Sequence, residues 1–116
     1  MLQTLSKSQK KVARTLIDLA LERECQQFIL DLSDMSQKPL DPVDRPNHAR
    51  YLELFKAMDA FDKRLAQRYD GITGGRYMEA AAFLFVEGKL TDDDLAFCDD
   101  AMQEEILRYH AVLTRI

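Results

Sequence analysis

The chain has 116 residues, of which 47% are hydrophobic and 31% charged, enough for one domain with a continuous core. Its formal net charge of -4 opposes general nucleic-acid binding, which needs a basic surface to displace counterions from phosphate. No apolar run approaches the ~20 residues that span a bilayer, and the N-terminus lacks the apolar core of a secretion signal. We therefore expect a cytoplasmic protein that does not insert into a membrane. Neither of its two cysteines, Cys25 and Cys98, has metal-site spacing, so we expect both to be reduced.

The first half of the chain predicts two helices and a proline-rich connection. The first helix is expected over about 7–32, which makes it the longest element. All three prolines fall in the connection, 33–46, where they oppose helix. The second helix is expected over 47–70, with Asn47 as its N-cap and Gly71 as its stop.

The second half predicts two more helices. A short third helix, about 76–87, is apolar on nearly every side and should be the most enclosed element. Thr91 with Asp94 three residues later forms a capping signature for a fourth helix over 92–115. No strand-like alternation occurs. The sequence therefore predicts an all-α fold, with 1–116 as a single helical domain arranged as a four-helix bundle or an orthogonal helical array.

The length of the 33–46 connection bears on topology. Fourteen residues exceed the two to eight that usually join antiparallel helices. The connection is therefore long enough to carry the chain back along the bundle and set the second helix parallel to the first. A simple up-and-down order, with a draped loop, stays open.

Charge is unevenly distributed. Four bases begin the first helix, and between Leu90 and Leu107 the chain carries seven acids and no base. These regions are either two solvated faces, which we favour, or partners between chains or through a crossover topology. The basic patch also gives a third functional hypothesis, weak nucleic-acid contact. Its members are Lys7, Lys10, Lys11 and Arg14.

One acid interrupts an apolar series in the second helix. Asp62 falls at the three-and-four spacing of a set of apolar residues, and Glu24 has a similar place in the first helix. We favour a structural interpretation, in which Asp62 makes a polar link across the bundle. Under the alternative, Asp62, Glu24 and Asp59 face inward and bind a divalent metal in an enzyme, for example a nucleotide phosphohydrolase. The series around Asp62 comprises Tyr51, Phe55, Met58, Leu65 and Tyr69.

The third and fourth helices carry more apolar residues than three neighbouring helices can cover. Surplus apolar surface usually marks an interface, and a two-fold symmetric dimer is the commonest solution. The leading hypothesis is therefore a non-enzymatic helical interaction module without a cofactor, which forms a homodimer through these two helices; another protein is the other partner considered. An orthogonal packing that encloses the third helix within one chain is the structural alternative. The expected interface residues are Phe97, Leu107, Phe83, Phe85 and Val86.

Overall fold

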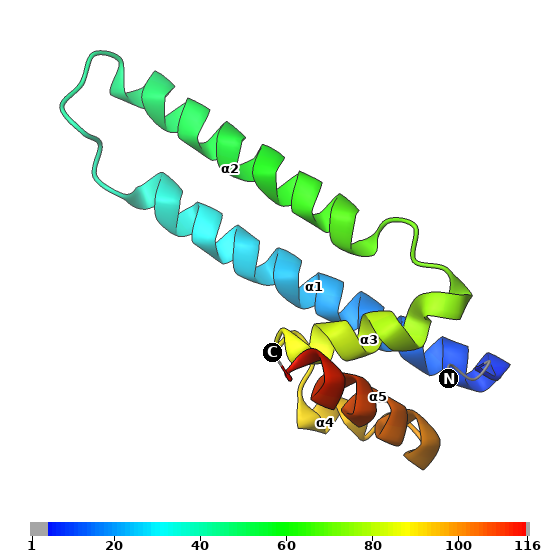
Figure 1. The fold of residues 1–116 in the computed structure, drawn as a ribbon. Coiled ribbons are helices and arrows are strands. Elements are labelled where there is room, and N and C mark those ends of the chain that lie inside the picture. Colours follow the sequence, from blue (N-terminus) through cyan, green and yellow to red (C-terminus); the bar gives the residue numbers. More distant parts are fainter. Residues whose placement is uncertain (1–4, 116) are drawn as a thin grey trace. The chain divides into compact units, whose positions relative to one another are not determined.

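The structure of the protein is a computed structural model, in which residues 5–115 are described. These residues form helices and no strand, so the all-α prediction is confirmed. Contacts divide the chain into two compact units. One is the hairpin, Glu24–Asp70, and the other is the split unit, which consists of 1–23 and 71–116. The elements are α1 (Lys7–Gln37), α2 (Pro46–Tyr69), the 3-10 turn η1 (Gly74–Arg76), α3 (Tyr77–Val86), α4 (Asp92–Leu95) and α5 (Asp100–Leu113) (Figure 1).

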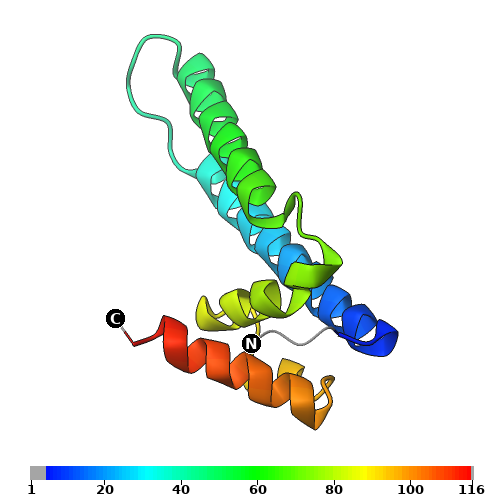
Figure 2. The ribbon, with the colours of Figure 1, turned by 45° about the vertical axis from the view of Figure 1, so that its right-hand side comes forward.

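The hairpin consists of α2 and the second half of α1, running antiparallel (Figures 1 and 2). Glu24 contacts Tyr69 and Phe28 contacts Phe61, so contacts move back along α2 as the chain moves forward along α1. Of the two orders that the sequence left open, the parallel one is therefore wrong, and these two helices follow the up-and-down order. Because α1 continues to Gln37 rather than ending near 32, only eight residues, 38–45, join the helices, which is within the usual length for a helical hairpin.

The ends of these helices differ in detail from those expected. Helix α1 continues past 32 to Gln37, and in its last turn the Ser36 hydroxyl donates to the Ser33 carbonyl at 2.7 Å. Asn47 is not the N-cap of α2, because Pro46 already occupies the first turn, where its missing N–H costs nothing. The cap position is Arg45, in a left-handed conformation with φ 52° and no side-chain cap. Gly71 does follow the end of α2, with φ 78°.

The split unit contains the core. Among the described residues, every fully buried side chain lies in it. Helix α3 packs along α5 and buries Met78, Ala81, Ala82 and Leu84, whereas Phe83 is 50% exposed. The first half of α1 adds a buried face of its own. The buried residues are Ala13, Leu16, Ile17, Ala20, Met78, Ala81, Ala82, Leu84, Leu90, Asp94, Leu95, Cys98, Met102 and Ile106.

The predicted fourth helix is two helices. The chain leaves α4 after Leu95 in a short turn, in which the Cys98 N–H donates to the Leu95 carbonyl at 2.9 Å. Asp99 then caps α5, because its carboxylate accepts a hydrogen bond from the Met102 N–H at 2.8 Å. A continuous helix over 92–115 was therefore wrong, and the missed signal is a second N-cap within the acidic run. The Thr91 and Asp94 capping box at the start of α4 is present as expected.

The two cysteines lie in different environments. Cys98 is buried in the core of the split unit, and burial raises the pKa of its thiol. Cys25 is half-buried in the hairpin. Both are free thiols, and Cys98 serves as a small apolar side chain in the core.

Candidate interaction surfaces

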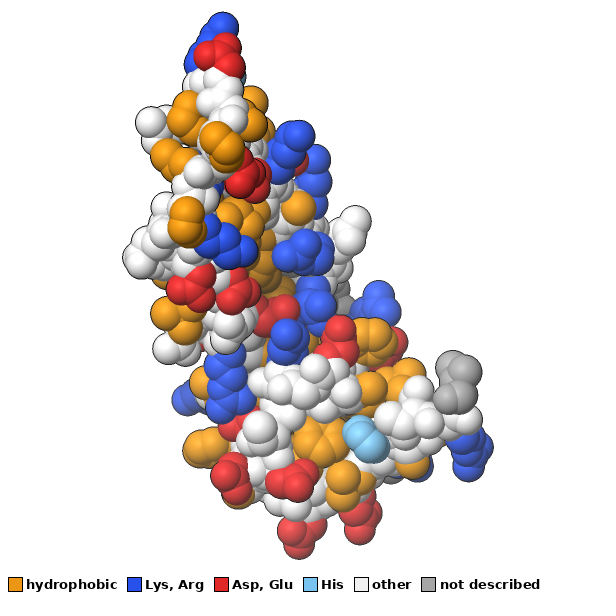
Figure 3. Space-filling model, turned by 90° about the vertical axis from the view of Figure 1, so that its left-hand side faces the viewer, with side chains coloured by type: hydrophobic (Ala, Val, Ile, Leu, Met, Phe, Trp, Pro, Cys, Tyr) orange, Lys and Arg blue, Asp and Glu red, His pale blue; other side chains and the backbone are white. Residues whose placement is uncertain are grey.

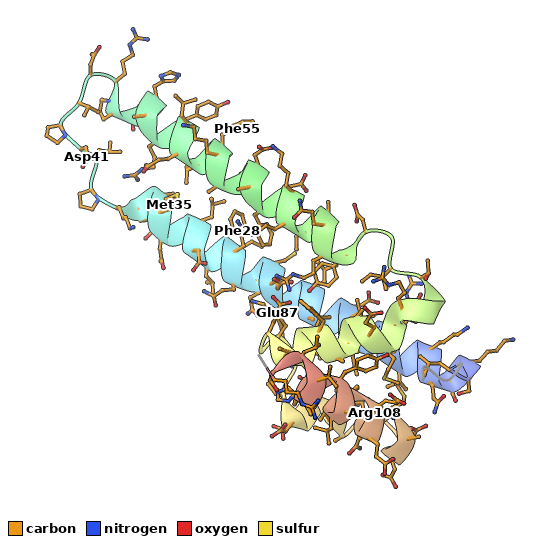
Figure 4. All side chains as sticks on the ribbon, in the orientation of Figure 1. Phe28, Met35, Asp41, Phe55, Glu87 and Arg108 are labelled. Atoms are coloured by element: carbon orange, nitrogen blue, oxygen red, sulfur yellow. The ribbon has the colours of Figure 1, made fainter. Side chains whose placement is uncertain are left out.

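An apolar seam joins the two helices of the hairpin. The phenyl rings of Phe28 and Phe61 stack with centroids 4.0 Å apart and planes 2° apart. Phe28 lies between the helices in Figure 4, whereas Phe55 points away from α1. The half-buried seam residues recur at three-and-four spacing, as in a coiled coil, and comprise Cys25, Phe28, Leu32 and Met35 of α1 with Leu54, Ala57, Phe61 and Leu65 of α2.

Polar contacts close both ends of this seam. At one end the Tyr69 hydroxyl donates to the Glu24 carboxylate at 2.5 Å, and the Arg68 guanidinium lies 3.4 Å from the same oxygen. At the other end the Arg50 guanidinium donates to the Lys38 carbonyl at 3.0 Å. Glu24 therefore has the structural role that the sequence favoured for such acids, a polar link between helices.

The hairpin has no core that excludes water. None of its residues is fully buried, although it carries large apolar side chains on both helices. Tyr51, Phe55 and Met58 are 61%, 57% and 53% exposed. Figure 3 shows hydrophobic side chains reaching the surface between charged ones along this part of the chain. The hairpin thus leaves exposed the kind of surface that proteins usually bury.

Asp62 continues this exposed series and does not face an interior. The polar link across the bundle that the sequence favoured for Asp62 is not formed within the described residues, and the inward placement is also wrong, because the series Tyr51, Phe55, Met58 and Asp62 lies on the outer side of α2. We call these four residues the outer stripe. Each of them comes one position after a residue that faces α1. Successive residues are 100° apart around a helix, so the outer stripe is turned away from α1 by about that angle. Asp62 makes no hydrogen bond or ion pair with any residue in 5–115.

The outer stripe extends onto α1. Viewed down the axes of two antiparallel helices, successive residues turn clockwise in one helix and anticlockwise in the other. Residues one position after the seam therefore lie on the same side of the pair. Ile29 follows the seam residue Phe28 and is 63% exposed. By this geometry, Ile29 lies on the same side of the hairpin as Phe55 and Met58.

The acids of the metal hypothesis have separate surroundings. Glu24 bonds to Tyr69, Asp59 accepts a hydrogen bond from Lys63 at 2.8 Å, and Asp62 faces outward. Within 5–115 no three side chains of His, Cys, Asp or Glu are grouped as a metal would require. The inward carboxylate cluster expected under that hypothesis is therefore not formed by these residues.

The stretch between Leu90 and Leu107 that carries seven acids, here called the acidic segment, is joined to α1 by an ion pair within the split unit. The Arg23 guanidinium donates to both carboxylate oxygens of Asp94, at 2.7 and 3.0 Å, and to the Lys89 carbonyl at 3.1 Å. The side chain of Asp94 is 5% exposed and that of Arg23 40%. Hydrogen bonding by Arg23, and then by the Thr91 N–H and hydroxyl, lowers the pKa of Asp94 to about 2.

The predicted basic patch is not what makes this connection. Lys7, Lys11 and Arg14 are exposed and Lys10 is half-buried, and none of the four forms an ion pair with a residue of the described range. Instead α1 reaches the acidic segment through Arg23 and through Gln9, whose amide donates to Asp99 at 3.0 Å. The sequence allowed these two regions to pair only between chains or through a crossover topology. In the structure they meet within one chain and without that topology, through other residues of α1.

The five expected interface residues differ in exposure. Phe97 is 68% exposed, Phe83 and Leu107 are about half exposed, and Phe85 and Val86 are half-buried. Leu107 shares a helix face with His110, whose ring lies 5.1 Å from that of Phe85.

Phe83 lies on the opposite side of the α3 and α5 pair. It shares a face with Glu79, which is close enough to Tyr109 to raise the pKa of that phenol, although burial is the larger cause. Beside Tyr109 is a shallow depression of about 190 Å³, and Arg108, which lines it, is labelled in Figure 4. The other lining residues are Glu105 and Val112, and Glu105 pairs with Arg108. Acidic side chains gather on the surface formed by α4 and α5 (Figure 3).

The comparisons with known proteins find no relative. No family model matches the chain, and no curated protein or solved structure is similar to it. Within 5–115, no helix is both long enough and apolar enough to cross a lipid bilayer. The surface chemistry of the two units therefore carries the functional argument.

Proposed function

We propose that the chain is a non-enzymatic helical interaction module that self-associates through the outer side of its hairpin. The single observation that carries this proposal is the exposure of apolar side chains on the hairpin, none of whose residues is fully buried. The exposed side chains are those of Tyr51, Phe55, Met58 and Ile29. The cytoplasmic location expected from the sequence belongs to the same proposal.

Helix α2 has more apolar surface than helix α1 covers. A helix in water gains most of its stability from packing an apolar face, and α2 packs only about half of its apolar arc against α1. Completely burying a side chain such as Phe or Met contributes about 1.5 to 3 kcal/mol relative to leaving it exposed. A second hairpin laid on the outer stripe would complete a four-helix arrangement, which is the usual way for antiparallel helix pairs to acquire a core.

The hairpin fits this role better than the surface predicted on the third and fourth helices. Phe83 and Leu107 face different sides of the α3 and α5 pair, whereas the three apolar residues of the outer stripe follow one another on a single helix. Contiguous apolar area is the feature that distinguishes an interface from scattered exposed residues. The proposal therefore keeps the dimer and changes its surface.

The test is the mass in solution, measured by light scattering from low to high micromolar concentration. We expect the unaltered chain to give a dimer, and Phe55→Glu and Met58→Glu each to give a folded monomer. Gln67→Glu is the matched control, because Gln67 is an exposed residue of the same helix outside the apolar arc and the change adds the same charge. A monomer at every concentration would overturn the proposal.

A second pair of variants separates the two surfaces. Phe97→Glu and Leu107→Glu should leave the dimer intact, because both residues lie outside the hairpin. If these two variants dissociate the dimer while Phe55→Glu does not, the interface is the one predicted from the sequence and the hairpin assignment is wrong.

A further inference from the structure

The outer stripe has the same spacing of residues in both directions along α2. Its members, Tyr51, Phe55, Met58 and Asp62, are separated by four, three and four residues, so the spacing is symmetric about the point between Phe55 and Met58. The chemistry is complementary about that point. One end of the stripe carries a phenol and the other a carboxylate, and the two central positions carry an aromatic ring and a thioether.

Such symmetry has meaning in a two-fold contact. In an isologous interface, residue i of one copy contacts residue j of the other, and j contacts i. Two antiparallel copies of α2 with their axis between Phe55 and Met58 place each Phe55 opposite Met58 of the other copy. The same register places each Tyr51 opposite Asp62 of the other copy.

We infer that the hairpin binds a second copy of this chain in that antiparallel register, with the Tyr51 hydroxyl of each copy donating to the Asp62 carboxylate of the other. This inference rests on the proposed function and specifies its partner and geometry. Two reciprocal methionine and aromatic contacts form the centre, where sulfur packs favourably against a ring. Two reciprocal hydrogen bonds close the ends.

The surroundings of the end residues favour this pairing. Within 5–115 neither the Tyr51 hydroxyl nor the Asp62 carboxylate makes a hydrogen bond, and both side chains are exposed. The imidazole of His48 stacks on the Tyr51 ring with centroids 6.3 Å apart. A phenol donor and a carboxylate acceptor match, and hydrogen bonds to a charged partner are the stronger kind.

This arrangement gives Asp62 a reason to interrupt an apolar series. If the second copy slid by one helical turn in one direction, Asp62 would lie opposite Phe55 and lose water without gaining a hydrogen bond, which costs free energy. A slide in the other direction would place Tyr51 opposite Met58 and break both hydrogen bonds. A single polar residue in an apolar seam is known to specify register in this way. Asp62 would thus fix how the two copies align.

The experiment is a double-mutant cycle on the dimer dissociation constant, measured by sedimentation. Tyr51→Phe should raise the dissociation constant about tenfold or more in the unaltered chain, because it removes both hydrogen bonds to a charged acceptor. The same change should have no effect in the Asp62→Ala background. Tyr77→Phe and Asp34→Asn serve as controls outside the outer stripe, and circular dichroism confirms that each variant is folded.

The outcomes separate this inference from the proposed function. A dimer that dissociates with Phe55→Glu but shows independent effects of Tyr51→Phe and Asp62→Ala would overturn the register and leave self-association standing. A dimer that survives Phe55→Glu, or a chain that is monomeric throughout, would overturn both. Coupling between Tyr51→Phe and Asp62→Ala would support both.

Discussion

The ion pair between Arg23 and Asp94 makes a quantitative prediction about stability. The pKa of Asp94 is lowered from 3.8 to about 2, mainly by the Arg23 guanidinium. One pKa unit corresponds to about 1.4 kcal/mol, so the ionised carboxylate adds about 2 kcal/mol to the free energy of unfolding. Asp94→Asn keeps the size and an acceptor oxygen but removes the charge, and should lose about this amount at neutral pH.

The pH dependence has a definite sign. The pKa of Asp94 is lower in the folded than in the unfolded protein, so its contribution is fully present above about pH 4 and disappears as the pH falls towards 2. The difference in stability between the unaltered chain and Asp94→Asn should shrink over the same range. Urea unfolding followed by circular dichroism at several pH values measures it.

The neighbouring residue offers a matched control. Asp93→Asn makes the same change in charge on the same helix turn, but Asp93 is exposed and should lose no more than about 0.3 to 1 kcal/mol through the helix dipole. Equal effects of the two substitutions would refute the role given to Arg23. So would a difference for Asp94→Asn that persists unchanged at pH 2.

The remaining predictions concern the core, the caps and the hairpin. Ile106→Ala should lower the free energy of unfolding by about 2 to 5 kcal/mol, because Ile106 is 0% exposed; a smaller loss in urea unfolding would mean that the core collapses around it. Asp99→Ala should cost about 1 kcal/mol and increase amide exchange at Met102, whose N–H it caps, and unchanged exchange would contradict that cap. Glu24→Gln should weaken the hairpin by about 1 kcal/mol, seen as faster amide exchange near Tyr69, whereas unaltered protection there would contradict a stabilising role for the hydrogen bond between Tyr69 and Glu24. Adding Mg²⁺, Mn²⁺, Ca²⁺ or Zn²⁺ should leave the thermal midpoint unchanged, since the candidate acids have separate surroundings, and a metal-specific rise would revive the enzyme hypothesis.

The sequence predicted the elements better than it predicted their faces. Periodicity located the long helices and α3, because this signal depends on local chemistry, whereas the N-cap predicted at Asn47 was wrong. The break after Leu95 was missed, because an acid that caps a helix and an acid that merely begins one look alike in a sequence. Asp99 differs only in what its carboxylate contacts.

The candidate site was harder to predict for a geometric reason. In α2 the series containing Leu54 and Phe61 and the series containing Phe55 and Met58 have the same period and differ by one residue. Periodicity shows that α2 has a wide apolar arc, but not which half of it a neighbouring helix covers. The series containing Asp62 was assumed to be the covered half, and the sequence therefore predicted that this exposed acid faces inward. A second apolar series one residue from the first was the available signal for a two-sided helix.

The interruption of the split unit by the hairpin has a consequence for the order of folding. Arg23 and Asp94 are 71 residues apart in the chain, and Gln9 and Asp99 are 90 apart, so these contacts close long loops and are slow to form. The hairpin brings its own first and last residues together, since Tyr69 donates a hydrogen bond to Glu24. Once the hairpin has formed, its residues no longer add to the entropy lost when the loop closes, and fewer flexible residues separate α3 from the first half of α1. We therefore expect the hairpin to act as an early folding element that shortens the effective loop on which the core of the split unit depends.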